Sequence, residues 1–282
     1  MSGLSIIIPA HNEASVVART LNSILANKLD RPLQIVVVAN GCTDDTAARA
    51  ETYPGVHVID TSVPGKGHAL NLGDSHATGF PGFYVDADIE LSYDAIRAVG
   101  RVLERGDALV AAPRIAIDLA GRPWRVRAYY DIWTRLPYLR HRHVGSGVYA
   151  VSEAGRERFD QFPEMIADDL FIRNIFEPEE RMTVASHTFT VRPPTTLRGI
   201  VQVRTRVLAG NAELIRAMPH LARQTEAPRP LGSIAGSPRL WPGAAIYTGV
   251  YAAARAKAAW KVRRGDLKHW ERDDSARVEV GS

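Results

Sequence analysis

The spacing of apolar residues over the first 90 positions predicts strands that alternate with helices. Short apolar runs, rich in Val and Ile, are typical of buried strands, and they lie at 4–9, 33–39, 56–60 and 82–88. Segments that read as helices separate them, at 15–26, 46–51 and 68–76. Because the connections are short, this alternation predicts an α/β fold in which a parallel sheet carries helices on both faces.

Beyond residue 88 the pattern departs from this regular alternation. We expect helices at 93–104 and 166–176, strands at 108–117, 145–151 and 182–191, and mainly helix from about 197. A stretch at 222–237 is rich in Pro, Gly and Ser and predicts a mobile connection.

Two carboxylates, Asp86 and Asp88, close the fourth predicted strand. Alternate side chains of a strand face the same way, so the two would point together at the carboxyl edge of the sheet. This is the edge at which open α/β folds bind ligands, and paired carboxylates suit a divalent cation that holds phosphates. The alternative interpretation is a turn rich in Asp.

Composition is that of an ordinary globular protein, but charge is distributed unevenly along the 282 residues. Residues 192–282 hold 16 Lys and Arg against 7 Asp and Glu, which favours an anionic partner or, alternatively, a solvated basic surface. Cys42 is the only cysteine, which excludes a disulfide framework and a cysteine zinc site. With no secretory signal visible at the start, we expect a cytoplasmic protein.

Four segments, in order, resemble the family 2 glycosyltransferases, which have a GT-A fold and use nucleotide-sugars. They are the strand and Pro-x-x-Asn-Glu loop at 6–13, the loop at 40–46, the Lys-Gly-x-Ala-x-Asn-x-Gly helix at 65–73 and Asp-x-Asp at 86–88. Each is weak alone, but their common order over residues 5–88 is specific. Cys42 stands where the family usually has Ser. Ala39 and Asn40 replace acids that help many relatives to read uracil, which leaves the nucleobase open: UDP is the default expectation, with GDP and dTDP as alternatives.

The resemblance implies a nucleotide-sugar donor and Mn²⁺ or Mg²⁺ as cofactor. The implied donor-binding residues are Pro9, Ala10, Asn12, Glu13, Asn40, Asp44, Lys66, Gly67, Asn71, Asp86 and Ala87. The implied metal ligands are Asp88, Asp86 and, as in some relatives, His187. For three of these residues a plainer interpretation stays open: Asp44 as a helix cap, Lys66 as an exposed turn residue and His187 as an ordinary strand residue.

On the acceptor side, Gly145, Ser146 and Gly147 resemble the family's glycine-entered strand, where small residues let a sugar approach the backbone. Asp168 and Asp169 resemble the acidic pair whose second member is the catalytic base of an inverting transfer, with Asp168 orienting it. The alternative is that the two acids only stabilise the helix, because negative charges are favourable beside the positive end of its dipole.

The resemblance ends near Arg204 and Arg206, where Val207 replaces the family's Trp. This departure, and the lack of a long apolar run, argue against a processive polysaccharide synthase. We therefore expect a GT-A catalytic domain at 1–205 and a basic, mainly helical extension at 206–282. The apolar but Lys- and Arg-bearing stretch 240–262 is either a peripheral helix on an anionic membrane or a helix packed on the catalytic domain with its basic face in water.

Together these features predict an inverting hexosyltransferase that acts on a hydroxyl of a sugar, a lipid-linked sugar or a small molecule. Cell-envelope polysaccharide, glycolipid and natural-product synthesis are the candidate settings, and the Arg- and aromatic-rich stretch 122–143 is a candidate lid. A sugar nucleotidyltransferase is the first alternative, but its Gly-rich loop after the first strand is missing. A non-catalytic protein that binds nucleotides or anionic surfaces is the second, and nucleic acid is not an expected partner.

Overall fold

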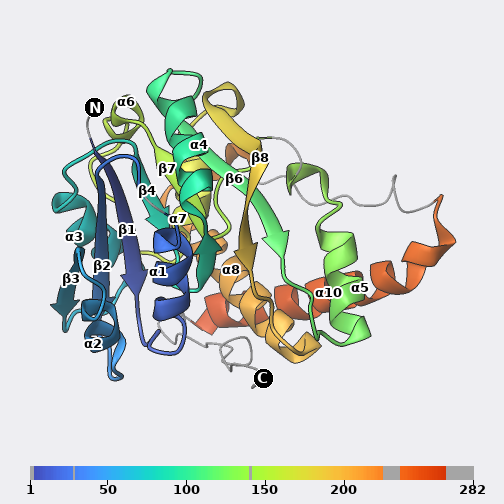
Figure 1. The fold of residues 1–282 in the computed structure, drawn as a ribbon. Coiled ribbons are helices and arrows are strands. Elements are labelled where there is room, and N and C mark those ends of the chain that lie inside the picture. The colour runs from blue at the N-terminus through green and yellow to red at the C-terminus, as the bar shows by residue number, and fades with distance from the viewer. Residues whose placement is uncertain (1–2, 28, 140–141, 225–235, 265–282) are drawn as a thin grey trace. The chain divides into compact units, whose positions relative to one another are not determined.

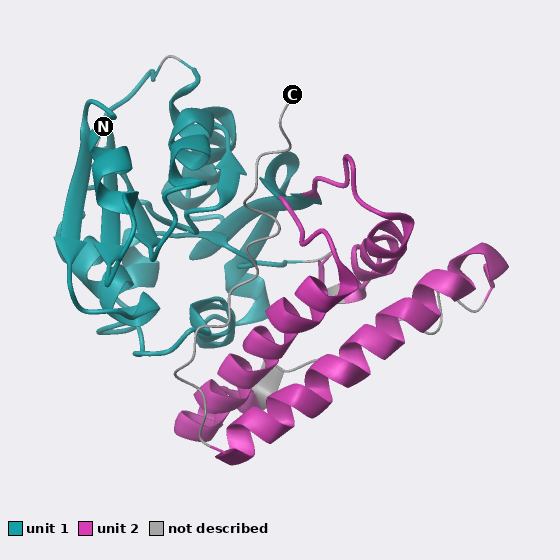
Figure 2. Ribbon diagram, turned by 90° about the horizontal axis from the view of Figure 1, so that it is seen from below, with its two compact units in different colours: residues 1–116, 142–191 teal, residues 117–141, 192–282 magenta. Residues whose placement is uncertain are grey.

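The computed structural model describes residues 3–27, 29–139, 142–224 and 236–264. The chain forms two compact units, residues 1–116 with 142–191 and residues 117–141 with 192–282 (Figure 2). This division differs from the boundary at 205 expected from the sequence. One helix, α8 (Leu197–Ala217), runs through that position, and the segment 117–141 joins the second unit because it packs there.

Unit 1 is built on an eight-stranded sheet with the order β3-β2-β1-β4-β7-β6-β8-β5 (Figure 1). The strands are β1 (Leu4–Ala10), β2 (Leu33–Asn40), β3 (Val56–Thr61), β4 (Gly82–Val85), β5 (Ile89–Leu91), β6 (Val110–Ile117), β7 (Val148–Val151) and β8 (Arg181–Val191). The first four are parallel, as predicted. By contrast, β7 runs antiparallel to β4 and β6, and β5 runs antiparallel to β8. The result is a mixed α/β sheet with a parallel half.

Helices cover both faces of this sheet, as the alternating pattern predicts. They are α1 (Val17–Leu25), α2 (Thr46–Glu51), α3 (Lys66–Ser75), α4 (Tyr93–Glu104), α6 (Glu153–Arg156), α7 (Asp168–Ile175) and the short η2 (Pro178–Glu180). On one face, Ile6 and Ile8 pack in a core with α1 and α4. On the other face Val36 and Val38 pack against Ala69 of α3. The period of two along each strand therefore sorts its side chains between two cores.

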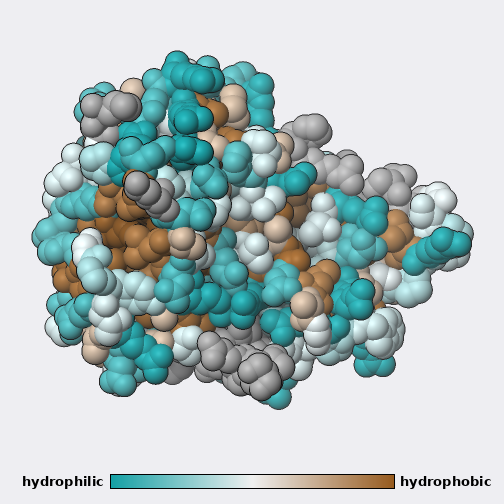
Figure 3. Space-filling view, in the orientation of Figure 1, coloured by the Kyte–Doolittle hydropathy of each residue, from teal (hydrophilic) through white to brown (hydrophobic). Residues whose placement is uncertain are grey.

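Hydrophobic residues also reach the surface on the side of the outer parallel strands. Figure 3 shows them gathered over the region of β1 to β3, with hydrophilic residues around them. Val56 and Val58 of β3, the strand at this end of the sheet, are partly buried and pack against the main core.

Unit 2 is helical. It contains α5 (Trp124–Trp133), η1 (Pro137–Leu139), α8, η3 (Pro219–Gln224), η4 (Pro238–Leu240) and α10 (Trp241–Arg264). Most of the predicted connection at 222–237 lies outside the described residues. Part of the predicted lid forms α5, whose Tyr129 is buried and stacks on Tyr247 of α10 with 5.4 Å between ring centroids. Closure of this segment over a site stays a prediction.

The long helix α10 packs against α8 and α5 through one stripe of buried residues. Its members are Gly243, Tyr247, Val250, Ala254 and Ala258. This segment therefore packs on two other helices of unit 2, while Trp241 and Trp260 stay exposed. In the part of the chain that the structure describes, none of the helices combines the length and apolar character needed to span a membrane.

Candidate functional site

The backbone at Asp86 and Asp88 forms a turn, not the strand end predicted from the sequence. Strand β4 ends at Val85, the N–H of Asp86 donates to the carbonyl of Gly147 at 2.8 Å, and the N–H of Ile89 donates to the carbonyl of Asp86 at 3.2 Å. The alternation argument for the two carboxylates was therefore wrong, because a tight turn replaces the pleat between them. Both side chains are nevertheless partly exposed beside the carboxyl edge of the parallel strands.

Helix α1 holds this turn through contacts that the sequence reading missed. The hydroxyl of Thr20 donates to the carbonyl of Ala87 at 2.6 Å, and Arg19 donates to the carbonyl of Asp88 at 3.2 Å. Thr20 is fully buried. A polar residue on the apolar face of a predicted helix was the available signal, because a buried hydroxyl requires a partner.

Lys66, at the start of α3, joins the predicted donor and catalytic residues. Its Nζ lies 2.7 Å from Oδ1 of Asp86 and 2.7 Å from Oδ1 of Asp168. Burial alone would lower the pKa of Lys66, but the carboxylates of Asp168, Asp86 and Asp169 outweigh it and raise that pKa above its ordinary value. The ammonium is thus held charged between two carboxylates that are 82 positions apart in the chain.

The acidic pair at the start of α7 has two different environments. Asp168 is buried and also accepts a hydrogen bond from the hydroxyl of Tyr149 at 3.1 Å. Burial, followed by the negative charge of Asp168, raises the pKa of Asp169 to about 7. Oδ2 of Asp169 accepts from the N–H of Ser146 at 2.9 Å, whereas its buried Oδ1 has no hydrogen-bond partner among the residues described. A carboxylate with a pKa near neutrality and an unused oxygen suits a general base.

The loop 145–147 passes between the carboxylates in a left-handed conformation. The φ angles are 102° at Gly145, 64° at Ser146 and 98° at Gly147. An added Cβ would lie 3.0 Å from Oδ1 of Asp169 at Gly145, and 3.1 Å from Oδ2 of Asp86 at Gly147. The two glycines therefore let the backbone approach both carboxylates. From the sequence, their small size was expected to make room for a sugar.

Buried Asn40 at the end of β2 ties together the loops of the predicted nucleotide side. Its Nδ2 donates to the carbonyl of Ala10 at 2.8 Å, and its Oδ1 accepts from the N–H of Gly65 at 3.1 Å. The adjoining Pro9 is buried in β1. Asn40 thus positions the loop before α3, and its side chain is already hydrogen-bonded on both ends.

The neighbouring loops 11–14 and 41–46 are also linked side chain to backbone. Oδ1 of Asn12 accepts from the N–H of Thr43 at 2.7 Å, and the N–H of Glu13 donates to Oγ1 of Thr46 at 2.7 Å. Asp44 accepts from the N–H of Thr46 at 3.1 Å and from that of Ala14 at 3.2 Å. Asp44 precedes Asp45, the N-cap of α2, at which no side-chain capping hydrogen bond forms, so the choice between a cap and a donor ligand stays open for Asp44.

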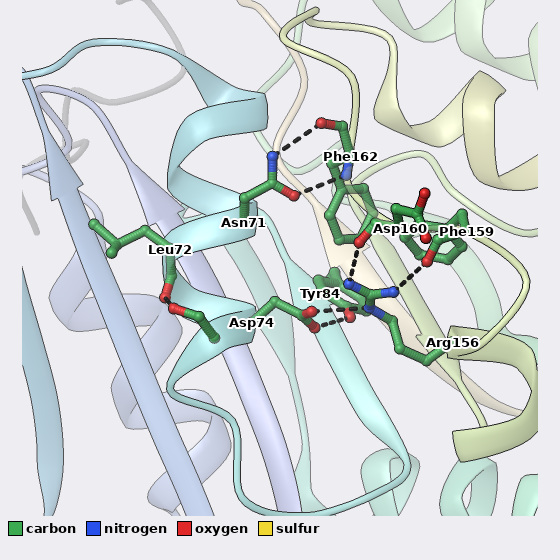
Figure 4. Close-up of polar contacts among 9 residues, drawn as sticks. Asn71, Leu72, Asp74, Tyr84, Arg156, Phe159, Asp160 and Phe162 are labelled. Carbon is green, nitrogen blue, oxygen red and sulfur yellow. Dashed lines mark hydrogen bonds and ion pairs between the residues drawn. The ribbon is translucent and has the colours of Figure 1, made fainter.

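Asn71 and Gly67 of α3 hold the segment 159–163 against the helix. Figure 4 shows the amide of Asn71 paired with the backbone of Phe162, donating to its carbonyl at 2.9 Å and accepting from its N–H at 2.7 Å. A Cβ on Gly67 would lie 2.1 Å from the carbonyl oxygen of Pro163, so no side chain fits there. The structure thus gives both residues a structural use, and the nucleotide contact expected from the resemblance stays a prediction.

A second group on α3, absent from the sequence reading, extends this attachment. Asp74 accepts from the hydroxyl of Tyr84 and pairs with Arg156, Nε to Oδ2, at 2.8 Å (Figure 4). Arg156 also donates to the carbonyls of Phe159 and Asp160 at 2.5 and 2.8 Å. No sequence motif marks this group, because Arg156 of α6 lies 82 positions after its partner Asp74 of α3.

His187 lies away from the Asp86–Asp88 turn, so the structure does not support it as a metal ligand. In the register of β5 and β8, Ile89 pairs with Val191 and Leu91 with Phe189. His187 is four residues from Val191, roughly 14 Å at about 3.4 Å per residue. Its Nδ1 lies 3.0 Å from Oγ of the adjacent Ser186.

The remaining donor set fits a divalent cation that arrives with a ligand. Within the described ranges, no three His, Cys, Asp or Glu side chains form a metal-binding group. Mg²⁺ is commonly held by one or two carboxylates, with waters and substrate phosphates completing the shell. Asp86 and Asp88 supply two partly exposed carboxylates of the required hard-oxygen type. Lys66 already neutralises one oxygen of Asp86, which leaves the other for a cation.

Comparison with known sequences agrees with this geometry. The family model described as "Glycosyl transferase family 2" matches residues 5–153, just over half of the chain. The 4,4'-diaponeurosporenoate glycosyltransferase of Staphylococcus aureus (strain MRSA252) is 37% identical over 102 residues, which are 34% of this chain and 27% of that protein. The match thus spans about a quarter of the relative's length.

Two solved structures show the same fold. The mannosyltransferase PcManGT from Pyrobaculum calidifontis, in complex with GDP-Man and Mn²⁺, has a TM-score of 0.58 at 22% identity, over 92% of this chain and 75% of its own. TarS 1–349 of S. aureus, in complex with UDP, has a TM-score of 0.51 at 16% identity, over 98% and 95%. At these identities the likeness shows the fold, a GT-A-type mixed α/β sheet flanked by helices.

Proposed function

This chain belongs to glycosyl transferase family 2, and from that premise we propose that it moves a sugar from a nucleotide diphosphate sugar to a hydroxyl acceptor with inversion of configuration. The observation that carries the proposal is Asp169, whose Oδ1 is buried without a partner and whose pKa is raised to about 7. Both properties are expected of a base that awaits an acceptor hydroxyl.

In the proposed reaction, Oδ1 of Asp169 takes the proton of the acceptor hydroxyl. The acceptor oxygen attacks the anomeric carbon, the bond from this carbon to the diphosphate oxygen breaks, and the nucleoside diphosphate leaves from the opposite face. Lys66 keeps Asp168 and Asp86 in place by its two ion pairs. A divalent cation, Mn²⁺ or Mg²⁺, held by Asp88 and Asp86 would neutralise charge on the leaving diphosphate.

The proposed donor is a UDP-sugar, with GDP- and dTDP-sugars as competitors. The two neighbours above were solved with GDP-Man and with UDP, so the shared fold accommodates both bases. The side chain of Asn40, the position at which many relatives have an acid, is engaged within the protein. The acceptor, whether a sugar, a lipid-linked sugar or a small molecule, is part of the same proposal.

Calorimetry against UDP, GDP and dTDP, each with and without Mn²⁺, tests the proposal on wild type and on Asp88→Ala. We expect one nucleotide to bind in a metal-dependent way and the variant to lose at least about tenfold in affinity, because a cation links the carboxylate to the diphosphate. Asp107→Asn, at an exposed position outside the site, is the matched control.

Absence of binding to all three nucleotides would overturn the proposal. Binding without cleavage of any nucleotide-sugar, even with water as acceptor, would instead favour the non-catalytic nucleotide-binding protein.

A further inference from the structure

His143, which no motif singled out, is buried beside the loop that contacts Asp169. Its side chain is 5% exposed, and its Nε2 lies 2.9 Å from Oγ of Ser146. The hydroxyl of Thr183 donates to the backbone carbonyl of His143 at 2.8 Å, which fixes this residue to β8. Burial, together with the positive charges of Arg173 and Arg181, lowers the pKa of His143 to about 3. The imidazole is therefore neutral at physiological pH.

Ser146 has a backbone conformation that requires support. Its φ of 64° lies in the left-handed region, which a non-glycine residue rarely adopts. In that conformation its N–H points at Oδ2 of Asp169, 2.9 Å away. The hydroxyl of Ser146 is engaged by His143, so one residue joins the buried imidazole to the carboxylate through its side chain and its backbone.

We propose that His143 is a positioning residue for the transfer: it holds Ser146 so that the serine N–H fixes one oxygen of Asp169 and leaves the other for the acceptor. The inference rests on the proposed function, because it assigns His143 a role in aiming the same base. The hydrogen bond to Oδ2 sets the plane of the carboxylate, and Gly145 lies against its other oxygen, with an ideal Cβ only 3.0 Å away. Oδ1 is thereby presented in one orientation.

Three variants separate positioning from mere stability. His143→Leu removes the contact to Ser146, His143→Gln keeps a polar group within reach of it, and Ser146→Ala removes the hydroxyl while keeping the Cβ that makes the left-handed conformation unfavourable. The assay is release of UDP from UDP-glucose, or of GDP from GDP-mannose, with water as acceptor. We expect kcat to fall roughly 10- to 100-fold in His143→Leu and Ser146→Ala, since small misplacements of a reacting group have effects of this size.

The KM for the donor should stay unchanged, His143→Gln should recover part of the rate, and the double variant should lose no more than either single one. The acid limb of the pH–rate profile should also move to higher pH, because a hydrogen bond to the ionised form of Asp169 is lost. The charged groups around Asp169 that set this limb are Asp168 of α7, Lys66 of α3 and Asp86 after β4. His57→Leu, at an exposed position of β3, is the control.

An NMR titration of the Asp169 carboxyl carbon tests the hydrogen bond from the N–H of Ser146 without requiring turnover, because its midpoint reports the pKa of Asp169. An unchanged titration midpoint in both His143→Leu and Ser146→Ala overturns the inference, as does an unchanged kcat in an enzyme that cleaves its donor. If wild type cleaves no nucleotide-sugar, the proposed function fails while the titration still decides whether His143 orients Asp169.

Discussion

At the scale of single residues, the two carboxylate oxygens of Asp169 differ: Oδ2 accepts a hydrogen bond and Oδ1 accepts none from the residues described. Oδ2 is hydrogen-bonded to the backbone of Ser146, while burial and the neighbouring Asp168 make the charge unfavourable. Because its pKa is raised in the folded protein, the folded state binds this proton more tightly than the unfolded state does. Between the ordinary value of 3.8 and about 7, the contribution of Asp169 to stability therefore decreases as pH rises.

Asp169→Asn should accordingly lower the rate and raise stability at neutral pH. We expect kcat to fall roughly 10²- to 10⁴-fold, the usual contribution of a general base, while the midpoint of thermal unfolding at pH 8 increases because a buried charge is removed. In wild type, kcat/KM should fall about tenfold per pH unit below pH 7 as the base becomes protonated. A variant with the wild-type rate, or a flat pH profile, would contradict the assignment of Asp169.

At the scale of elements, α3 connects the site to the rest of unit 1. Its first residue, Lys66, lies between two carboxylates, its second has no room for a side chain, and Asn71 pairs with the backbone of Phe162. The residues of the family motif in this helix therefore have two kinds of use: Gly67 and Asn71 make structural contacts, and Lys66 supplies a charge. A shift of α3 would therefore move Lys66 away from Asp168.

Asn71→Ala tests whether this helix residue serves the fold or the donor. The substitution leaves the N–H and carbonyl of the buried Phe162 without their partner, so we expect a loss of about 1–3 kcal/mol in the free energy of unfolding, measured with urea. Ser75→Ala, on the exposed end of the same helix, should change it by less than about 0.5 kcal/mol. Wild-type stability combined with weakened nucleotide binding would show instead that Asn71 contacts the donor.

At the scale of the whole molecule, the two units differ in chemistry. Unit 1 contains the carboxylates of the candidate site, and the basic C-terminal third belongs to unit 2. In α10, Trp260 is 51% exposed and the guanidinium of Arg264 lies 4.2 Å from its ring centroid; Trp241 is 58% exposed. Exposed Trp beside basic side chains is typical of helices that bind membrane interfaces.

We therefore predict that α10 binds peripherally to anionic membranes, and vesicle flotation measures this binding. Wild type should float with vesicles of phosphatidylcholine and phosphatidylglycerol but not with phosphatidylcholine alone, and salt should weaken the binding because charge attraction is screened. Replacing Trp241 and Trp260 together by Ser should reduce binding at least about threefold, since buried apolar area contributes to it. Val63→Ser, an exposed apolar residue of unit 1, is the control. Equal recovery with both vesicle types would contradict the prediction.

Local pattern by itself determined most of the elements of unit 1 and indicated the family, but it missed β5 and α6. The helices at 46–51 and 93–104 end where the sequence predicts, and the parallel order of the first four strands follows from short connections between alternating elements. Each of these features depends on residues a few positions apart, whose burial follows the period of a helix or a strand. The acidic pair and the glycine-flanked loop were also visible as motifs.

Only the tertiary structure decided how these motifs meet. The ion pairs of Lys66, the turn at Asp86, the contact of His143 with Ser146 of the loop 145–147 and the attachment of Asn71 to Phe162 bring together residues that the local pattern does not connect. The packing of α5 on α10 likewise joins elements far apart in the chain, and because of it residues 117–141 belong to the second unit. Periodicity states which side of an element is buried, but the partner it meets depends on how the whole chain folds back on itself.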